Sequence, residues 1–166
     1  MPLNEADAVL LRKALLHVEF AQYLTAAETD KLIAAFDKAV MKKGDVLIEQ
    51  GTIGSIFYLV AEGSVGVYRK RAFLDKRVAL LGPGSYVGEM ALISKQPRSA
   101  AVACEENGIV FTLLRDDFRN ILLGNPHISS IIQRTATKRK EELVDIEINE
   151  RISHQKQSSD PDNQKT

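Results

Sequence analysis

Between about residues 39 and 114 the apolar residues come in short runs, and this stretch limits the possible folds more than any other part of the chain. The runs are DVLIEQ, IFYLVAEG, SVGVYRK, RVALL, SAAVAC and IVFTLL. Turn residues separate most of them, namely Gly44, Gly51, Gly54, Gly63, Gly82, Pro83, Gly84 and Gly108. Short apolar or alternating segments bounded by turns are typical of antiparallel strands. We therefore predict a mainly β fold, a small antiparallel barrel or jelly roll of roughly eight short strands.

Helical patterns flank the predicted strands. Residues 5–18 carry apolar side chains spaced by three and four behind Asn4 as N-cap. Residues 26–36 begin after Thr25, which forms a capping-box pattern with Glu28. After the strands, the helical period returns in RDDFRNILL and in a longer segment over 127–152. The predicted organisation is an N-terminal helical segment over 1–38, a β-roll over 39–114, C-terminal helices over 115–152 and a disordered polar tail over 153–166.

Charge and composition exclude several classes of function. The 166 residues include 22 basic and 22 acidic ones, so no net field favours nucleic acid or an anionic membrane. Cys104 is the single cysteine, which excludes an internal disulfide and a thiolate zinc site. No apolar run reaches the roughly 18 residues that span a bilayer, and the acidic start does not resemble a secretory signal. We expect a cytoplasmic protein. If it binds an anion, a local site must hold it, because the net charge is zero.

One segment, GPGSYVGEMALISKQPRSAAV over 82–102, interrupts the strand pattern. It combines Gly88, a short helical pattern over 89–92 and Arg98 just before apolar residues resume. The first turn of a helix offers unpaired N–H groups and a positive partial charge to an anion. Gly88 permits close approach of backbone to ligand, and the Arg98 guanidinium can donate two parallel hydrogen bonds to phosphate oxygens. The segment therefore predicts a phosphate-binding site.

Glu89 requires a separate explanation, because a carboxylate repels a bound phosphate. A ligand hydroxyl can donate a hydrogen bond to it, as a ribose does to acidic residues in dinucleotide sites. A phosphate together with a sugar hydroxyl indicates a nucleotide. The alternative is an internal ion pair between Glu89 and Arg98 that braces a loop.

The residues Gly88, Glu89, Met90, Ala91 and Leu92, followed by Pro97, Arg98, Ser99 and Ala100, resemble the phosphate-binding cassette of cyclic nucleotide-binding domains. The likeness covers about residues 20–150, places the cassette at 84–101 and is greatest to bacterial channel-type domains. It implies an eight-stranded antiparallel β-roll, or double-stranded β-helix, with N-terminal helices and C-terminal lid helices. It also implies cAMP or cGMP as a regulatory ligand, with no metal and no catalysis.

The same resemblance assigns roles to individual residues. Arg98 would bind the cyclic phosphate, and Glu89 would accept a hydrogen bond from the ribose 2′-hydroxyl. Backbone amides would complete the phosphate cradle after Gly88, at Met90, Ala91 and Ser99 or Ala100.

Contacts with the base are also implied. Ala79 and Leu81 alternate with outward residues and would form an apolar wall. Val87 departs from the family, which usually has an aromatic residue there, and looser packing behind the cassette is expected. Ser99 occupies a position where a hydroxyl can help to recognise guanine, although serine occurs there in cAMP binders too. We favour cAMP over cGMP.

In the family a helix after the β-roll closes over the base, and the segment 127–152 fits this role. Ile128, Ile132, Thr135, Ala136, Leu143 and Ile146 form one stripe at spacings of three and four. Arg139 falls in this stripe and either stacks on the purine or extends to solvent between Lys138 and Lys140. We expect the ligand to move these helices from mobile to docked and so to signal to a downstream protein partner.

Other classes of function fit the sequence less well. The three histidines, His17, His127 and His154, lie outside the strand region, so a histidine-held metal in the β-roll is not expected. Ser99 beside Glu89 lacks a candidate base, which argues against a hydrolase. Only the polar tail follows residue 152, too short for a helix-turn-helix domain. The remaining alternative is a structural or protein-interaction β-roll that no longer binds nucleotide.

Overall fold

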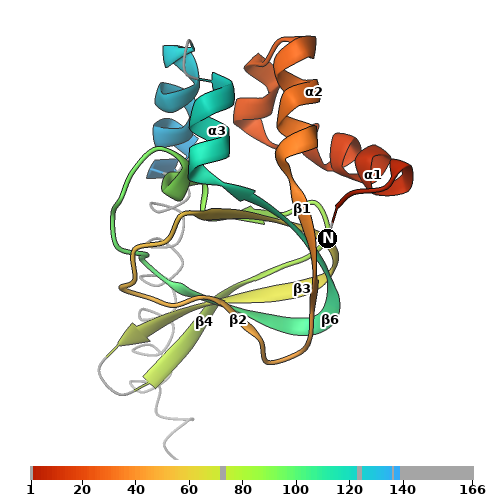
Figure 1. Cartoon of the computed structure of the whole chain (residues 1–166). Coiled ribbons are helices and arrows are strands. Elements are labelled where there is room, and N and C mark those ends of the chain that lie inside the picture. Colours follow the sequence, from red (N-terminus) through yellow and green to blue (C-terminus); the bar gives the residue numbers. More distant parts are fainter. Residues whose placement is uncertain (1, 72–73, 123–124, 136, 139–166) are drawn as a thin grey trace, which may run out of the picture.

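The computed structural model describes residues 2–71, 74–122, 125–135 and 137–138. Helices pack together at one end of a β-roll (Figure 1). The predicted mainly antiparallel β fold with flanking helices is confirmed. In chain order the elements are α1 Glu5–Leu15, η1 Glu19–Tyr23, α2 Ala26–Ala35, β1 Asp37–Met41, β2 Val46–Ile48, β3 Ile56–Arg71, β4 Leu74–Leu81, β5 Tyr86–Val87, η2 Glu89–Leu92, β6 Ala101–Leu114 and α3 Arg115–Leu122.

Both N-terminal helices begin at capping boxes. The Thr25 side chain accepts a hydrogen bond from the Glu28 amide at 3.1 Å, and Glu28 accepts one from the Thr25 amide at 2.9 Å. Asn4 caps α1 in the same way. The predicted helix over 5–18 is too long, because α1 ends at Leu15. Beyond that point the side-chain amide of Gln22 approaches three carbonyl oxygens between 2.9 and 3.1 Å, which satisfies backbone acceptors where the helix stops.

The sheet has the strand order β1-β6-β3-β4, with β2 paired to β6 and β5 to β3. The prediction of roughly eight short strands was wrong for the described residues, which form six strands, two of them long. Gly63 and Gly108 explain the difference, since both lie inside strands instead of ending them. A Cβ on Gly108 would collide with the carbonyl oxygen of Glu62 on the paired strand, so glycine allows close approach of the two backbones.

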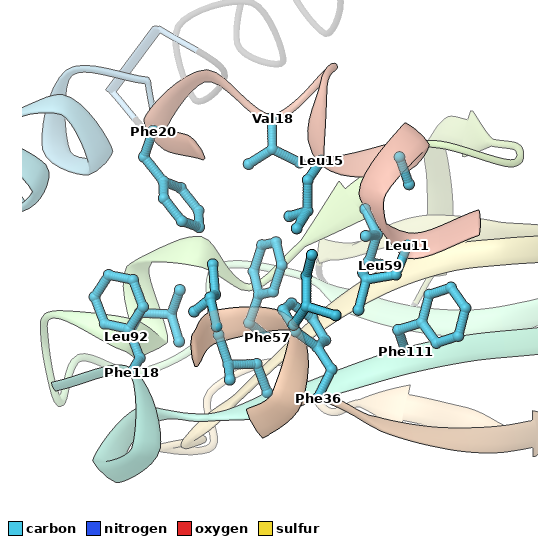
Figure 2. Packing of buried hydrophobic residues seen from close by; sticks show 14 of the residues in the cluster. Leu11, Leu15, Val18, Phe20, Phe36, Phe57, Leu59, Leu92, Phe111 and Phe118 are labelled. Carbon is cyan, nitrogen blue, oxygen red and sulfur yellow. The ribbon is translucent and has the colours of Figure 1, made fainter. Parts of the chain in front are cut away.

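Two apolar clusters form the core. One lies between the helices and the near end of the sheet, where Phe57 of β3 meets the rings of Phe20 and Phe36 at centroid distances of 6.0 and 6.2 Å (Figure 2). Leu92 of η2 is fully buried in this helical cluster. The second cluster fills the β-roll and includes Val60, Val65 and Val102. The short helix of the predicted phosphate cassette is therefore anchored in the helical cluster.

The helix expected from residue 127 is present over 126–135 and 137–138. Ile128, Ile132 and Thr135 are buried, as the stripe predicted. The isoleucines pack into the helical cluster, and the Thr135 hydroxyl donates to the Glu19 carboxylate of η1 at 2.7 Å. Arg139, the other stripe positions and the predicted tail over 153–166 lie outside the described residues.

Candidate functional site

The cassette begins with a left-handed residue between β5 and η2. Gly88 has φ +83°, a backbone conformation that residues other than glycine rarely adopt. Space demands glycine as well, because a Cβ there would lie 2.5 Å from Arg98 Nη1 and 2.9 Å from the carbonyl oxygen of Ile56. The residue that turns the chain into η2 thus also makes room for Arg98.

Arg98 is fixed through its backbone to the turn after β2. Its amide donates to the Thr52 carbonyl oxygen at 2.8 Å, and its own carbonyl oxygen accepts from the Gly51 amide at 2.8 Å. The side chain reaches across to β3, where Nη2 donates to the Ile56 carbonyl oxygen at 2.8 Å. Gly54 leaves the space for this path, since a Cβ there would lie 2.5 Å from both Nε and Nη2. Arg98 therefore lies within the fold, flanked by two glycines.

Burial is the largest influence on the pKa of Arg98. Desolvation lowers the pKa of its guanidinium, while the nearby Tyr58 and Glu89 raise it and Arg115 lowers it. Within the described part of the chain, the buried Nε of Arg98 has no hydrogen-bond partner. A buried donor without a partner is rare in proteins and is explained when a ligand completes it. The site thus presents a partly desolvated cation with donor capacity to spare, which suits a phosphate.

Glu89 brings an acid to the same place. It follows Gly88, begins η2 and is only 6% exposed. Its charge helps to raise the pKa of the Arg98 guanidinium. Arg98 Nη1 lies against Gly88, the residue before Glu89, so the structure brings the arginine to the start of η2, where the acid stands.

The backbone groups of the cassette are arranged less simply than predicted. The Ala91 amide donates to the Gly88 carbonyl oxygen at 3.0 Å, so this donor is already used inside the turn. Met90 is half-buried against the helical cluster. Ser99 is exposed and Ala100 is buried at the edge of the β-roll core.

The predicted apolar wall lies on β4. Ala79 and Leu81 are half-buried and pack against the β-roll cluster, whereas Leu80 between them is 53% exposed. The register shifts at Val78, which lets it face the same core as Ala79. Val87, the departure from the family pattern, is buried in the β-roll core. The aromatic residue in this region is its neighbour Tyr86, whose ring centroid lies 5.8 Å from that of Phe57.

Sequence reasoning missed three contributors to the site. Gly54 appeared only as a turn residue, and Ile56 only as part of an apolar run. Arg115, the first residue of α3, approaches the end of the cassette helix, with Nη1 3.2 Å from the Ser94 carbonyl oxygen and 3.5 Å from that of Ala91. These contacts depend on the three-dimensional path of the chain, and no motif marks them.

Other reactive groups lie away from this site or are protected. His17 and His127 are exposed. Over the described ranges no group of His, Cys, Asp and Glu side chains could hold a metal. Cys104 is buried, and desolvation raises the pKa of its thiol. Among the same residues, no helix has the length and apolar character needed to cross a membrane.

The chain is similar in sequence to several named proteins. It is 30% identical over 126 residues to the cyclic AMP receptor protein of Thermus thermophilus, an alignment that covers 75% of this chain and 58% of the relative. It is 32% identical over 123 residues to a cyclic nucleotide-gated potassium channel of Mesorhizobium japonicum, covering 74% of this chain and 33% of the channel. The chain therefore spans only part of each of these relatives.

The fold has close counterparts among solved structures. The cAMP-bound structure named PfPKA-R (141-441) superposes with a TM-score of 0.70 at 24% identity, covering 85% of this chain and 47% of the other. The family model described as the cyclic nucleotide-binding domain matches residues 38–125, which include the β-roll, the cassette and α3. The chain belongs to the cyclic nucleotide-binding domain family.

Proposed function

We propose that the chain is a cAMP-binding regulatory module without catalytic activity. The observation that carries the proposal is Arg98, a partly desolvated arginine held inside the fold beside Glu89, with a buried Nε that lacks a partner in the described part of the chain. Such a cation suits the single negative charge of a cyclic phosphate. The names of the receptor protein from Thermus and of the cAMP-bound structure support cAMP as the ligand.

In this proposal Arg98 donates to the exocyclic oxygens of the cyclic phosphate, and Glu89 accepts a hydrogen bond from the ribose 2′-hydroxyl. The amides of Met90 and of Ser99 or Ala100 contribute further donors. The Ala91 amide also donates to the phosphate. To do so it either shares its hydrogen between the phosphate and the Gly88 carbonyl oxygen or breaks its hydrogen bond to Gly88. Ala79 and Leu81 contact the base from β4.

We further propose that binding repositions the C-terminal helices and so signals to a protein partner. The helical cluster supports this, since it contains Leu92 of the cassette helix together with Ile128 and Ile132 of the C-terminal helix. We expect a change in the position of η2 to be transmitted through this cluster to the helix over 126–135 and 137–138. The ligand shifts the equilibrium only by its difference in affinity for the two arrangements. The same proposal includes Arg139, which would stack on the base when the C-terminal helices are docked.

The test is a calorimetric titration of the full chain with cAMP and with cGMP. We expect saturable binding, tighter for cAMP, and a loss of at least about a hundredfold in Arg98→Ala, where a charged hydrogen-bond donor is removed. Lys95→Ala is the matched control, because Lys95 is an exposed cation in the same loop. Absence of heat from both nucleotides would overturn the proposal and favour a β-roll that serves only structure or protein interaction.

A further inference from the structure

Arg115 joins three parts of the molecule. It is the first residue of α3, and its amide donates to the Ser55 carbonyl oxygen at 2.8 Å, just before β3. Its side chain is half-buried, and Nη1 lies 3.2 Å from the Ser94 carbonyl oxygen and 3.5 Å from that of Ala91. Arg115 therefore connects the start of α3, to which it belongs, with the segment before β3 and with the end of the cassette helix η2.

The contact with η2 is a C-terminal cap made by a cation. The last carbonyl groups of a helix lack partners within it and carry a negative partial charge, which an arginine side chain neutralises. The cassette helix contains only four residues, so it has few internal hydrogen bonds to fix its direction. Its orientation depends on outside contacts, namely Leu92 in the helical cluster and Arg115 at the end.

Consecutive carbonyl groups of one backbone segment hold the two arginines. The Ile56 carbonyl oxygen accepts from the Arg98 side chain, and the neighbouring Ser55 carbonyl oxygen accepts from the Arg115 amide, each at 2.8 Å. The charge of Arg115 is also near enough to lower the pKa of Arg98. Any shift of the cassette relative to this segment therefore changes the surroundings of both arginines.

We propose that Arg115 is a positioning residue for the nucleotide site, which holds η2 so that Glu89 and the cassette amides face the ligand and links that helix to α3. This inference rests on the proposed function, since it assumes that the cassette binds a cyclic nucleotide. Arg115 acts through η2 and does not itself contact the ligand. Its Nη1 is engaged by the carbonyl oxygens of Ser94 and Ala91.

The experiment compares Arg115→Ala and Arg115→Lys with Arg119→Ala in the full chain. Arg119 is an exposed arginine of the same helix and serves as the control. We expect Arg115→Ala to bind cAMP about tenfold more weakly, the effect of losing one charge-assisted hydrogen bond that supports the bound state. Lysine retains the charge and one of the two contacts, so Arg115→Lys should recover about half of the loss on a logarithmic scale. Arg119→Ala should bind as the wild type does.

A second measurement separates positioning from simple stabilisation of the fold. A residue that only stabilises the fold lowers Tm equally with and without ligand, whereas a positioning residue also reduces the rise in Tm that a fixed concentration of cAMP produces. An unchanged cAMP-induced rise in both Arg115 variants would overturn the inference. If Arg115→Ala does not fold, Arg115→Lys decides by the same measurement. Failure of the wild type to bind cAMP would instead refute the proposed function, so the two failures are distinct.

Discussion

Arg98 and Ile56, 42 positions apart in the chain, are joined by a hydrogen bond of 2.8 Å from the guanidinium to the backbone carbonyl oxygen. This contact gives the arginine one defined place before any ligand arrives. A side chain that is already ordered loses less conformational freedom on binding, which favours affinity. The bond uses one of the five N–H groups of the guanidinium, and the buried Nε has no partner in the described part of the chain.

Gly54→Ala is predicted to weaken cAMP binding while leaving the fold stable. The new Cβ would lie 2.5 Å from Arg98 Nε, and the side chain of Arg98 can swing away more easily than backbone can. We expect about a ten- to hundredfold loss of affinity, from the displaced charged donor, and a change in unfolding free energy within about 1 kcal/mol. Calorimetry and urea unfolding measure the two effects.

Gly82→Ala is the control for this substitution. It adds the same methyl group where no atom lies within 4 Å. Both affinity and stability should match the wild type. Equal affinities of Gly54→Ala and Gly82→Ala would show that the guanidinium position does not matter for binding.

Glu89→Gln is predicted to impair binding of cAMP but not of 2′-deoxy-cAMP. A carboxylate accepts the hydrogen bond of the 2′-hydroxyl more strongly than an amide does, and the deoxy ligand lacks that hydroxyl. We expect about a tenfold loss for cAMP, and for the deoxy ligand either no loss or a gain from reduced repulsion of the phosphate. Equal losses for both ligands would assign Glu89 to bracing Arg98, the ion-pair alternative.

Thr135→Val is predicted to loosen the C-terminal helix. Valine keeps the shape of the buried side chain but removes the hydrogen bond to Glu19, which lies on the exposed side of η1. The docked arrangement should lose about 1 kcal/mol. Hydrogen exchange should therefore accelerate several-fold in amides of residues 128–135 and remain unchanged in β3 and β6. Equal acceleration in the strands would mean that the helix and the β-roll open together.

Much of this fold could be predicted because local chemistry determines it. The capping box at Thr25 and Glu28 needs only residues three apart, and it marks the start of α2 correctly. The number of strands could not be obtained in this way. Glycine is typical of turns, but Gly63 and Gly108 each lie where β3 and β6 approach closely. This close approach is visible only from the pairing of residues that are distant in the sequence.

In the candidate site too, residues of one local motif could be predicted and residues from distant elements could not. Arg98, Glu89 and Gly88 belong to one short motif, so their juxtaposition could be predicted. Gly54 and Arg115 act on that motif from other elements, one by leaving space and the other by capping η2. Their roles depend on distances across the fold, which neither residue type nor spacing encodes.

The pair of Asp7 and Lys38 is predicted to make stability depend on acid pH. Lys38 Nζ lies 3.0 and 3.2 Å from the two carboxylate oxygens and joins α1 to β1. This hydrogen bond, with that of the Asn4 amide, lowers the pKa of Asp7 from its ordinary 3.8. A group whose pKa is lowered by folding stabilises the native state above its unfolded pKa, and the contribution disappears as pH falls through the folded value. Asp7→Asn should therefore be less stable than the wild type from pH 5 upward.

The difference in Tm between wild type and Asp7→Asn should shrink steadily below about pH 4. Asp30→Asn is the matched control, because Asp30 pairs with Arg12 on the surface, where both side chains are more than half exposed. Solvent screens such a pair, so its removal should change Tm little at any pH. A difference for Asp7→Asn that stays constant down to pH 2 would indicate that Asp7 contributes through its capping of α1 and not through its charge.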